Sequence, residues 1–176
     1  GTFYAKLGSK VTVVEFLPNL LPGVEADLIL PVSRNLTKLG VEVLLRSKAK
    51  GFSNGALLVD TPQGEKSIPA DKVLVSVGRS PNTAGLGLDK TGVELDAKGH
   101  IKVDKTGRTN VSNIYAAGDV VGAPYLAHKA SREGILAAHA IAGQPVHERG
   151  AIPAAIFTDP EISFVGETEA EAKGRG

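Results

Sequence analysis

Apolar and polar positions alternate along the first 45 residues in a way that predicts a parallel α/β arrangement. Residues 1–9 carry apolar side chains at helical spacing, so we expect the end of a helix there. KVTVVEF at 10–16 and VEVLL at 41–45 are short, apolar and rich in β-branched residues, as strands are, and the pattern from Glu25 to Leu39 is helical. The order helix, strand, helix, strand is typical of a parallel sheet.

The pattern changes between residues 47 and 77. Three strand-like runs follow one another there, joined by Asn54-Gly55 and by Gln63-Gly64, which are strong signals of tight turns. These runs predict an antiparallel meander inserted in a parallel fold. The last run, DKVLVSVG at 71–78, is nearly continuous in apolar residues, so we expect a strand that is buried on both faces.

Glycine, aspartate, proline and threonine are frequent in residues 79–107, which predicts a linker with short extended pieces. After it, NIYAAGDV at 113–120 is expected to form a strand, and residues 127–142 a helix with one side suited to close packing on a sheet. The small residues on that side are Ala127, Ala130, Gly134 and Ala138. AIPAAIFTDPEISFVG at 151–166 predicts two short strands around a turn, and a last helix should follow Thr168, a suitable N-cap.

Composition and charge exclude several classes of protein. The chain has 176 residues, is 42% hydrophobic and 22% charged, and carries a formal net charge of +1. Its basic residues are scattered, so neither nucleic acid nor an anionic membrane is an expected partner. No apolar run approaches the ~20 residues that a membrane-spanning helix needs. We therefore expect a cytoplasmic or organelle-matrix location.

Cysteine is absent from the sequence, which excludes a disulfide scaffold, a thiolate metal site and a thiol nucleophile within these residues. The histidines show no short spacing of the zinc-site kind, so no metal site is expected. Only structural roles are assigned to His100, His139 and His147. Methionine is absent as well and the chain begins Gly1-Thr2, from which we expect a fragment of a longer protein.

Glu15 stands at the carboxyl end of the first predicted strand, where open α/β sheets bind ligands. A carboxylate there can accept hydrogen bonds from the ribose hydroxyls of NAD and repel the extra phosphate of NADP. The glycine-rich loop that precedes such an acid by ~20 residues would lie before Gly1. A solvated glutamate at a strand end is the alternative.

Two further predicted strands each end in a glycine followed by a charged residue. Gly78 would let the backbone approach a cofactor without a Cβ clash, and Arg79 could face a phosphate or solvent. Gly118 would leave room for a ligand chain. Asp119 could accept hydrogen bonds from flavin ribityl hydroxyls, or it could cap the next turn.

LAHKASREG at 126–134 opens the predicted helix that follows. The free N–H groups and the dipole of its first turn favour an electron-rich acceptor, such as the pyrimidine edge of a flavin. His128 lies in this turn, where packing or hydrogen bonding is the alternative to catalysis. No carboxylate or serine at a recognisable spacing supports a catalytic triad.

Four segments, taken in order, resemble the pyridine nucleotide-disulfide oxidoreductases, and among them the dihydrolipoyl dehydrogenase group most closely. They are KLGSKVTVVE, VLVSVGRSPNT, NIYAAGDVVGAPYLAHKASREG and FTDPEISFVG. The resemblance implies an α/β flavoprotein with Rossmann-like FAD and NAD domains, an antiparallel meander and an α+β dimerisation domain. Residues 1–80 would be the last part of the NAD domain, 81–148 the returning part of the FAD domain, and 149–176 the start of the dimer-interface domain.

The same resemblance implies a role for several of the candidate residues. Glu15 matches the acid on the NAD ribose, and Gly78 matches the glycine near the nicotinamide half. Asp119 matches the aspartate on the FAD ribityl chain. The segment whose backbone lies against the flavin ring is matched by Leu126, Ala127 and His128.

The implied enzyme oxidises the dihydrolipoyl groups of 2-oxo acid dehydrogenase complexes with FAD and NAD as cofactors. Its implied partners are a second copy of the protein, lipoyl domains and the acyltransferase core of those complexes. The family's glycine loops, redox cysteines and His-Glu pair match nothing in these residues, so no catalytic residue is assigned. Related NAD(P)H-dependent disulfide or mercuric reductases, or a non-catalytic nucleotide-binding module, are the alternatives. Glu15 favours the dihydrolipoyl reading, since NADP users generally need basic residues there.

Overall fold

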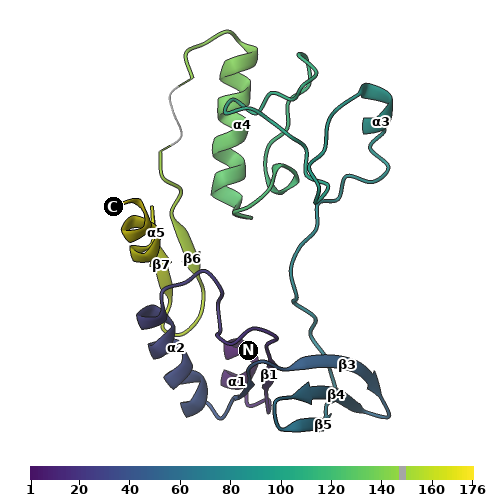
Figure 1. Cartoon of the computed structure of the whole chain (residues 1–176), viewed down its shortest axis with the longest axis vertical. Coiled ribbons are helices and arrows are strands. Elements are labelled where there is room, and N and C mark those ends of the chain that lie inside the picture. Colours follow the sequence, from purple (N-terminus) through teal and green to yellow (C-terminus); the bar gives the residue numbers. More distant parts are fainter. Residues whose placement is uncertain (147–149) are drawn as a thin grey trace. The chain divides into compact units, whose positions relative to one another are not determined.

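The computed structural model of the chain describes residues 1–146 and 150–176, and these residues divide into two units (Figure 1). The first unit contains residues 1–75 and 155–176, and the second contains residues 76–154. The division into three domains that the sequence suggests stays a prediction, and its second boundary falls outside the described residues.

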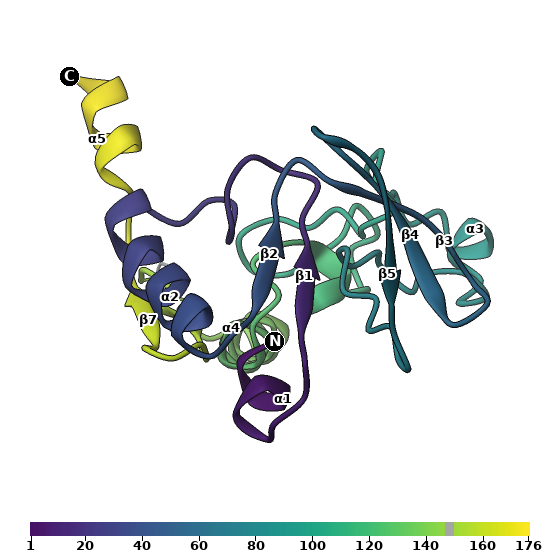
Figure 2. The same ribbon diagram turned by 90° about the horizontal axis from the view of Figure 1, so that it is seen from below.

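A short parallel pair of strands lies at the centre of the first unit. β1 (Thr12–Val14) pairs in parallel with β2 (Glu42–Leu44), and Figure 2 shows the two strands side by side. The helix α1 (Thr2–Lys6) precedes β1, and α2 (Ala26–Lys38) connects β1 to β2. Each element lies within the range that the apolar pattern indicates, so the predicted helix, strand, helix, strand order is confirmed.

The core of this unit lies between α2 and the strands. Val32 and Leu36 stand one helical turn apart on the buried face of α2 and are 1% and 7% exposed. They pack with Val41, which begins the run that forms β2, and with Ile162 from the far end of the chain. The C-terminal segment therefore belongs to the same core as the first two strands.

Two further strands and a helix form that C-terminal segment. β6 (Ala154–Ile156) and β7 (Ile162–Phe164) pair with each other, and α5 (Glu169–Arg175) follows them. Thr168 caps α5: its Oγ1 accepts from the backbone N–H of Glu171 at 3.2 Å, and its own N–H donates to the Glu171 carboxylate at 2.8 Å. The predicted strand pair and the predicted N-cap are both confirmed.

An antiparallel meander follows β2, also as predicted. β3 (Lys48–Ser53), β4 (Ala56–Thr61) and β5 (Gly64–Pro69) form one three-stranded sheet with β4 in the middle. The turn between β3 and β4 uses Asn54 and Gly55, whose φ angles of 49° and 72° are the two positive values that a tight hairpin turn needs.

The apolar run DKVLVSVG at 71–78 is not a strand, so that prediction was wrong. Leu74, Val75 and Val77 are 76%, 72% and 92% exposed, and the run joins no ladder within the described ranges. A strand exists only where its backbone N–H and C=O groups meet those of a neighbour. β1 and β2 pair with each other, and neither of them lies along this run.

The second unit consists mainly of loops packed on one long helix. Its elements are α3 (Leu88–Thr91), the 3₁₀ turn η1 (Asp119–Val121) and α4 (Ala127–Ile141). The segment NIYAAGDV at 113–120 is not the predicted strand, because it has one isolated bridge, from Tyr115 to Arg108, and then turns into η1.

α4 itself confirms the helix predicted for residues 127–142, but its buried face is not the predicted one. Ala127, Gly134 and Ala138 are exposed. The buried residues of the helix are Lys129, Glu133, Leu136 and Ala137. Loop backbone covers this buried face: a Cβ placed on Gly107 would lie 3.5 Å from the Ala137 Cβ. No helix in the described part of the chain is long and apolar enough to span a bilayer.

Candidate functional site

The loop that leads into α4 starts at Gly118, and its first turn depends on that glycine. Gly118 has φ 87° and ψ −154°, a conformation that glycine adopts readily and other residues avoid. A Cβ placed there would also come within 3.3 Å of the Ala130 Cβ on α4. The backbone can therefore run close against the helix just before Asp119, as the sequence suggests.

Asp119 begins the η1 turn and presents its carboxylate beside Arg79. Its Oδ2 accepts a hydrogen bond from Arg79 Nη2 at 2.9 Å, and the two side chains are 45% and 66% exposed. The guanidinium carbon of Arg79 also lies 5.9 Å from the ring centre of Tyr125, within the range of a cation–π contact. The structure thus brings together two of the residues singled out in the sequence, at an accessible point.

The N-terminus of α4 closes the other end of this loop. Leu126 is the N-cap residue and has the extended angles φ −128° and ψ 133°. Among the described residues, no side chain caps the first turn. The backbone N–H groups of Ala127 and His128 therefore have no intrahelical partner and lie at the positive end of the helix dipole. Such a turn can donate hydrogen bonds to an electron-rich ligand atom.

The side chain of His128 is engaged in a contact of its own. Its Nε2–H donates to the backbone carbonyl of Pro153 at 2.6 Å, and the residue is exposed. This contact agrees with a hydrogen-bonding role for the imidazole, and the backbone of His128 is the part that stands in the first turn of α4.

Lys129 and Glu133 form a buried ion pair on α4 that the sequence analysis missed. Lys129 Nζ lies 3.2 Å from Glu133 Oε1, and the side chains are 7% and 3% exposed. The available signal was two opposite charges at positions i and i+4 on the helix side that also carries Leu136 and Ala137. A charge in the middle of an apolar face indicates a buried partner.

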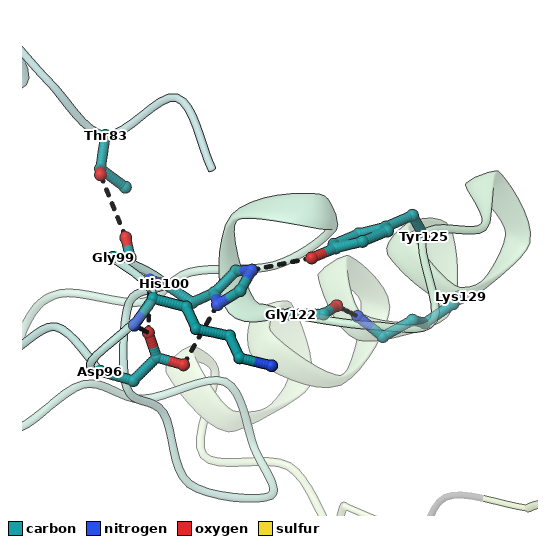
Figure 3. Close-up of polar contacts among 8 residues, drawn as sticks. Thr83, Asp96, Gly99, His100, Gly122, Tyr125 and Lys129 are labelled. Carbon is teal, nitrogen blue, oxygen red and sulfur yellow. Dashed lines mark hydrogen bonds and ion pairs between the residues drawn. The ribbon is translucent and has the colours of Figure 1, made fainter. Parts of the chain in front are cut away.

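A second polar cluster surrounds His100, which is 6% exposed (Figure 3). Its Nδ1 lies 3.1 Å from Asp96 Oδ2, and its Nε2 lies 2.9 Å from the Tyr125 hydroxyl. The backbone N–H of His100 also donates to Asp96, and this contact, with smaller ones, lowers the pKa of the Asp96 carboxyl from its usual 3.8. These contacts agree with the structural role assigned to His100.

The His100 cluster borders an open depression of about 380 Å³ lined by Asp96, His100, Gly122 and Tyr125, among others. Tyr125 links this cluster to Arg79 and therefore to Asp119. The ring of Tyr125 is thus fixed by His100 on one side and faces the Arg79 guanidinium. His147, to which a structural role was also assigned, lies outside the described residues.

Glu15 lies in the first unit, directly after β1. Its backbone continues the sheet contacts, because its N–H donates to the Leu44 carbonyl at 2.8 Å. Its carboxylate Oε1 accepts from the backbone N–H of Leu17 at 2.8 Å, and the residue is half-buried. The side chain therefore stands at the carboxyl end of the strand, in the place that the sequence indicates.

Gly78 lies in the second unit and has a φ of 132°, which favours glycine. The backbone around it is open, since nothing lies within 4 Å of a Cβ placed there. A ligand could therefore approach the main chain at this point. Over the described ranges, no group of histidine, aspartate and glutamate side chains is arranged to hold a metal ion.

The sequence of the chain matches a known protein family. Residues 1–134 match the family described as pyridine nucleotide-disulphide oxidoreductase. The chain belongs to this family. The match includes β1, the meander, the Gly118–Asp119 turn and the start of α4.

Curated relatives within the family are similar over the whole chain. Dihydrolipoyl dehydrogenase of Haloferax volcanii is 47% identical over 182 residues, which cover 99% of this chain and 38% of the relative. Dihydrolipoyl dehydrogenase of Bacillus subtilis is 46% identical over 182 residues, covering 100% of this chain and 39% of the relative. The chain thus spans less than two fifths of the length of these relatives.

Solved structures of the family share the fold. LpdA from Mycobacterium tuberculosis superposes with a TM-score of 0.88 at 31% identity, over 99% of this chain and 39% of its own. The HOCl-induced flavoprotein disulfide reductase RclA from Escherichia coli superposes with a TM-score of 0.86 at 27% identity, over 99% and 41%. The α/β fold class and the family resemblance expected from the sequence are therefore confirmed.

Proposed function

We propose that the complete protein containing this chain is a dihydrolipoyl dehydrogenase, an enzyme that oxidises dihydrolipoyl groups with FAD and NAD. The observation that carries the proposal is the 47% identity to the Haloferax volcanii enzyme over 99% of the chain. The proposal extends to the whole protein a similarity that covers 38% of that relative.

FAD would bind at the Gly118–Leu126 loop. The structure offers a carboxylate on Asp119 that is 45% exposed, and hydroxyl groups of a ribityl chain are suitable donors to it. The uncapped amides at the start of α4 would face the pyrimidine edge of the flavin. Gly118 lets the backbone run close against Ala130 of α4 just before Asp119. These features fit the cofactor, and they come from this chain's own residues.

The residues proposed to contact NAD are Glu15, Gly78 and Arg79. Glu15 would accept hydrogen bonds from the adenosine ribose, and its charge would disfavour a 2′-phosphate at the same point. Gly78 would allow the nicotinamide half to approach the backbone, and Arg79 would neutralise Asp119 or a phosphate group. The preference for NAD over NADP is therefore part of the proposal.

When bound, FAD would pass the two electrons of a dihydrolipoyl dithiol on to NAD. Exchange with the dihydrolipoyl dithiol needs a cysteine pair whose disulfide is reduced as the dithiol is oxidised, and these 176 residues contain no cysteine. The proposal places that pair elsewhere in the complete protein. The partners would be a second copy of the protein and the lipoyl domains and acyltransferase core of a 2-oxo acid dehydrogenase complex. The expected location is the cytoplasm or an organelle matrix.

A flavoprotein disulfide reductase with another substrate is the second candidate. It is favoured by the TM-score of 0.86 to RclA, which shows that the same fold serves a protein with that description. The lower identity of 27% to RclA makes it the weaker of the two.

The test is a comparison of substrates with the purified complete protein. Dihydrolipoamide and NAD should give NADH at a rate far above the rate at which NADPH is consumed with glutathione disulfide or with mercuric ion. Turnover of those alternative substrates together with none of dihydrolipoamide would replace the first candidate by the second. A protein that binds no flavin at all would contradict both candidates.

A further inference from the structure

A buried ion pair holds the loop that carries Asp119. Lys129 and Glu133 stand one turn apart on α4, with Nζ and Oε1 3.2 Å apart and side chains that are 7% and 3% exposed. Both point to the face of α4 on which the backbone of residues 118–122 is packed. The pair is thus enclosed between the helix and the loop.

Each partner also bonds to the loop backbone, at opposite ends of the same turn. Glu133 Oε2 accepts from the Gly118 N–H at 2.8 Å. Lys129 Nζ donates to the Gly122 carbonyl at 2.8 Å, a contact drawn in Figure 3, and lies 3.5 Å from the Gly118 carbonyl. Asp119 stands between these two anchored glycines.

Stability does not account for two buried charges at this place. Removing charges from water is costly, and replacing a buried ion pair by apolar side chains of similar volume is often neutral or stabilising. A fixed geometry is a better explanation. Gly118 and Gly122 have φ angles of 87° and 107°, and glycines have many accessible conformations, so a loop bounded by them needs contacts from outside to hold one.

We propose that Lys129 and Glu133 are positioning residues for the flavin. They would fix the turn between Gly118 and Gly122 so that the Asp119 carboxylate is held ready for the ribityl chain before the cofactor arrives. This inference rests on the proposed function, because it assumes that Asp119 meets FAD. Neither Lys129 nor Glu133 needs to touch the cofactor.

The test separates FAD affinity from folding stability in the complete protein containing this chain. The double variant K129M/E133L removes both anchors and keeps side chains of similar size, but it also takes these partners from the Gly118 N–H and the Gly122 carbonyl. Its melting temperature is therefore measured in parallel, and FAD affinity is compared at a temperature where both proteins are folded. We expect its Kd for FAD to rise about tenfold or more, equivalent to ~1.4 kcal/mol. The visible circular dichroism of the bound flavin should change as well, because the ring and ribityl chain would lose their fixed surroundings.

Two single variants at Glu133 and one control variant test which contact FAD binding depends on. Glu133→Gln keeps an oxygen that can accept from the Gly118 N–H, so it should recover most of the FAD affinity that Glu133→Ala loses. Arg132→Gln, at an exposed position on the same helix, should bind FAD like the wild type.

The outcomes distinguish this inference from the proposed function. If the wild type binds no FAD, the proposed function fails and the inference fails with it. If the wild type binds FAD and K129M/E133L binds it equally tightly with an unchanged flavin spectrum, only the inference is overturned. Should the double variant fail to fold, equal FAD affinity in Glu133→Gln and Glu133→Ala would overturn it instead.

Discussion

Replacing Asp119 by alanine should weaken FAD binding far more than it weakens the fold. In the structure the Asp119 carboxylate pairs with Arg79 at 2.9 Å, and the two side chains are 45% and 66% exposed. Exposed ion pairs contribute about 0–1 kcal/mol, because water screens the charges and the side chains lose freedom. The free energy of unfolding should therefore fall by less than about 1 kcal/mol.

The effect of the same change on the cofactor should be larger. A hydrogen bond from a ribityl hydroxyl to a carboxylate is charge-assisted and is worth about 1.5–3 kcal/mol. That range corresponds to a rise in the Kd for FAD of roughly tenfold to 150-fold. Asp119→Asn keeps an acceptor without the charge, so its Kd should lie between those of the wild type and the alanine variant.

The assay is a titration of the cofactor-free complete protein with FAD, followed by flavin fluorescence, with urea unfolding measured in parallel. Asp89→Ala is the control, since Asp89 is an exposed acid of α3 in the same unit. An Asp119→Ala protein that binds FAD as tightly as the wild type would refute the placement of the flavin at this loop.

Three further predictions concern the nucleotide, acid stability and the isolated chain. Glu15→Arg should narrow the preference for NAD over NADP, because it removes a repulsion of about 1–4 kcal/mol between the carboxylate and the 2′-phosphate. The measurement is kcat/KM with both nucleotides, and a wild-type protein that uses NAD and NADP equally well would contradict this role of Glu15. The His100 backbone N–H lowers the pKa of Asp96, and the Lys6 ammonium lowers that of Asp159, from the usual 3.8. Because the pKa of each carboxyl is lower in the folded state, its ionised form stabilises the fold above pH 3.8. That stabilisation is lost as the pH falls through the lower folded pKa. The urea midpoint of the wild type should accordingly fall more steeply below about pH 4 than that of Asp96→Asn. If the urea midpoints of the two proteins fall in parallel with pH, the contact between Asp96 and His100 does not stabilise the fold. The 176-residue chain expressed alone should form no NADH from dihydrolipoamide, since it has no cysteine for disulfide exchange; thiol-dependent turnover by this chain would falsify this.

Local signals in the sequence predicted most elements of the first unit. The β-branched run around β1, the helical spacing of Val32 and Leu36, and the Asn54-Gly55 turn each act through neighbouring residues, and each was found where the pattern indicates. The same holds for Thr168, whose capping contacts involve a residue three positions away. Such elements can be predicted from the sequence without knowing which residues pack against them.

The two runs that were wrongly predicted as strands depend on distant partners. DKVLVSVG has the composition of a buried strand, but Leu74 and Val77 are exposed and the run joins no ladder in the described ranges. NIYAAGDV makes one isolated bridge through Tyr115 before the η1 turn. Apolar composition indicates that a segment can form a strand, and only a neighbouring backbone turns it into one.

In the candidate site too, features that depend on neighbouring residues could be predicted, and contacts between residues far apart in the sequence could not. Gly118 and Asp119 were recognisable because glycine and a charge end an apolar run. Their contacts to Arg79 and Glu133 join residues 40 and 15 positions apart, and no spacing in the sequence indicates them. The buried face of α4 was misjudged for a related reason: small residues suggested that their side packs on a sheet, whereas the helix buries another side, which carries the Lys129–Glu133 ion pair.

A crystal structure of the complete protein with FAD bound tests the central claim most directly. The account predicts an Asp119 oxygen within hydrogen-bond distance of a ribityl hydroxyl, about 2.5–3.0 Å, and the first backbone N–H groups of α4 directed at the pyrimidine edge of the flavin. A flavin held elsewhere, with Asp119 and the start of α4 turned away from it, would contradict the account.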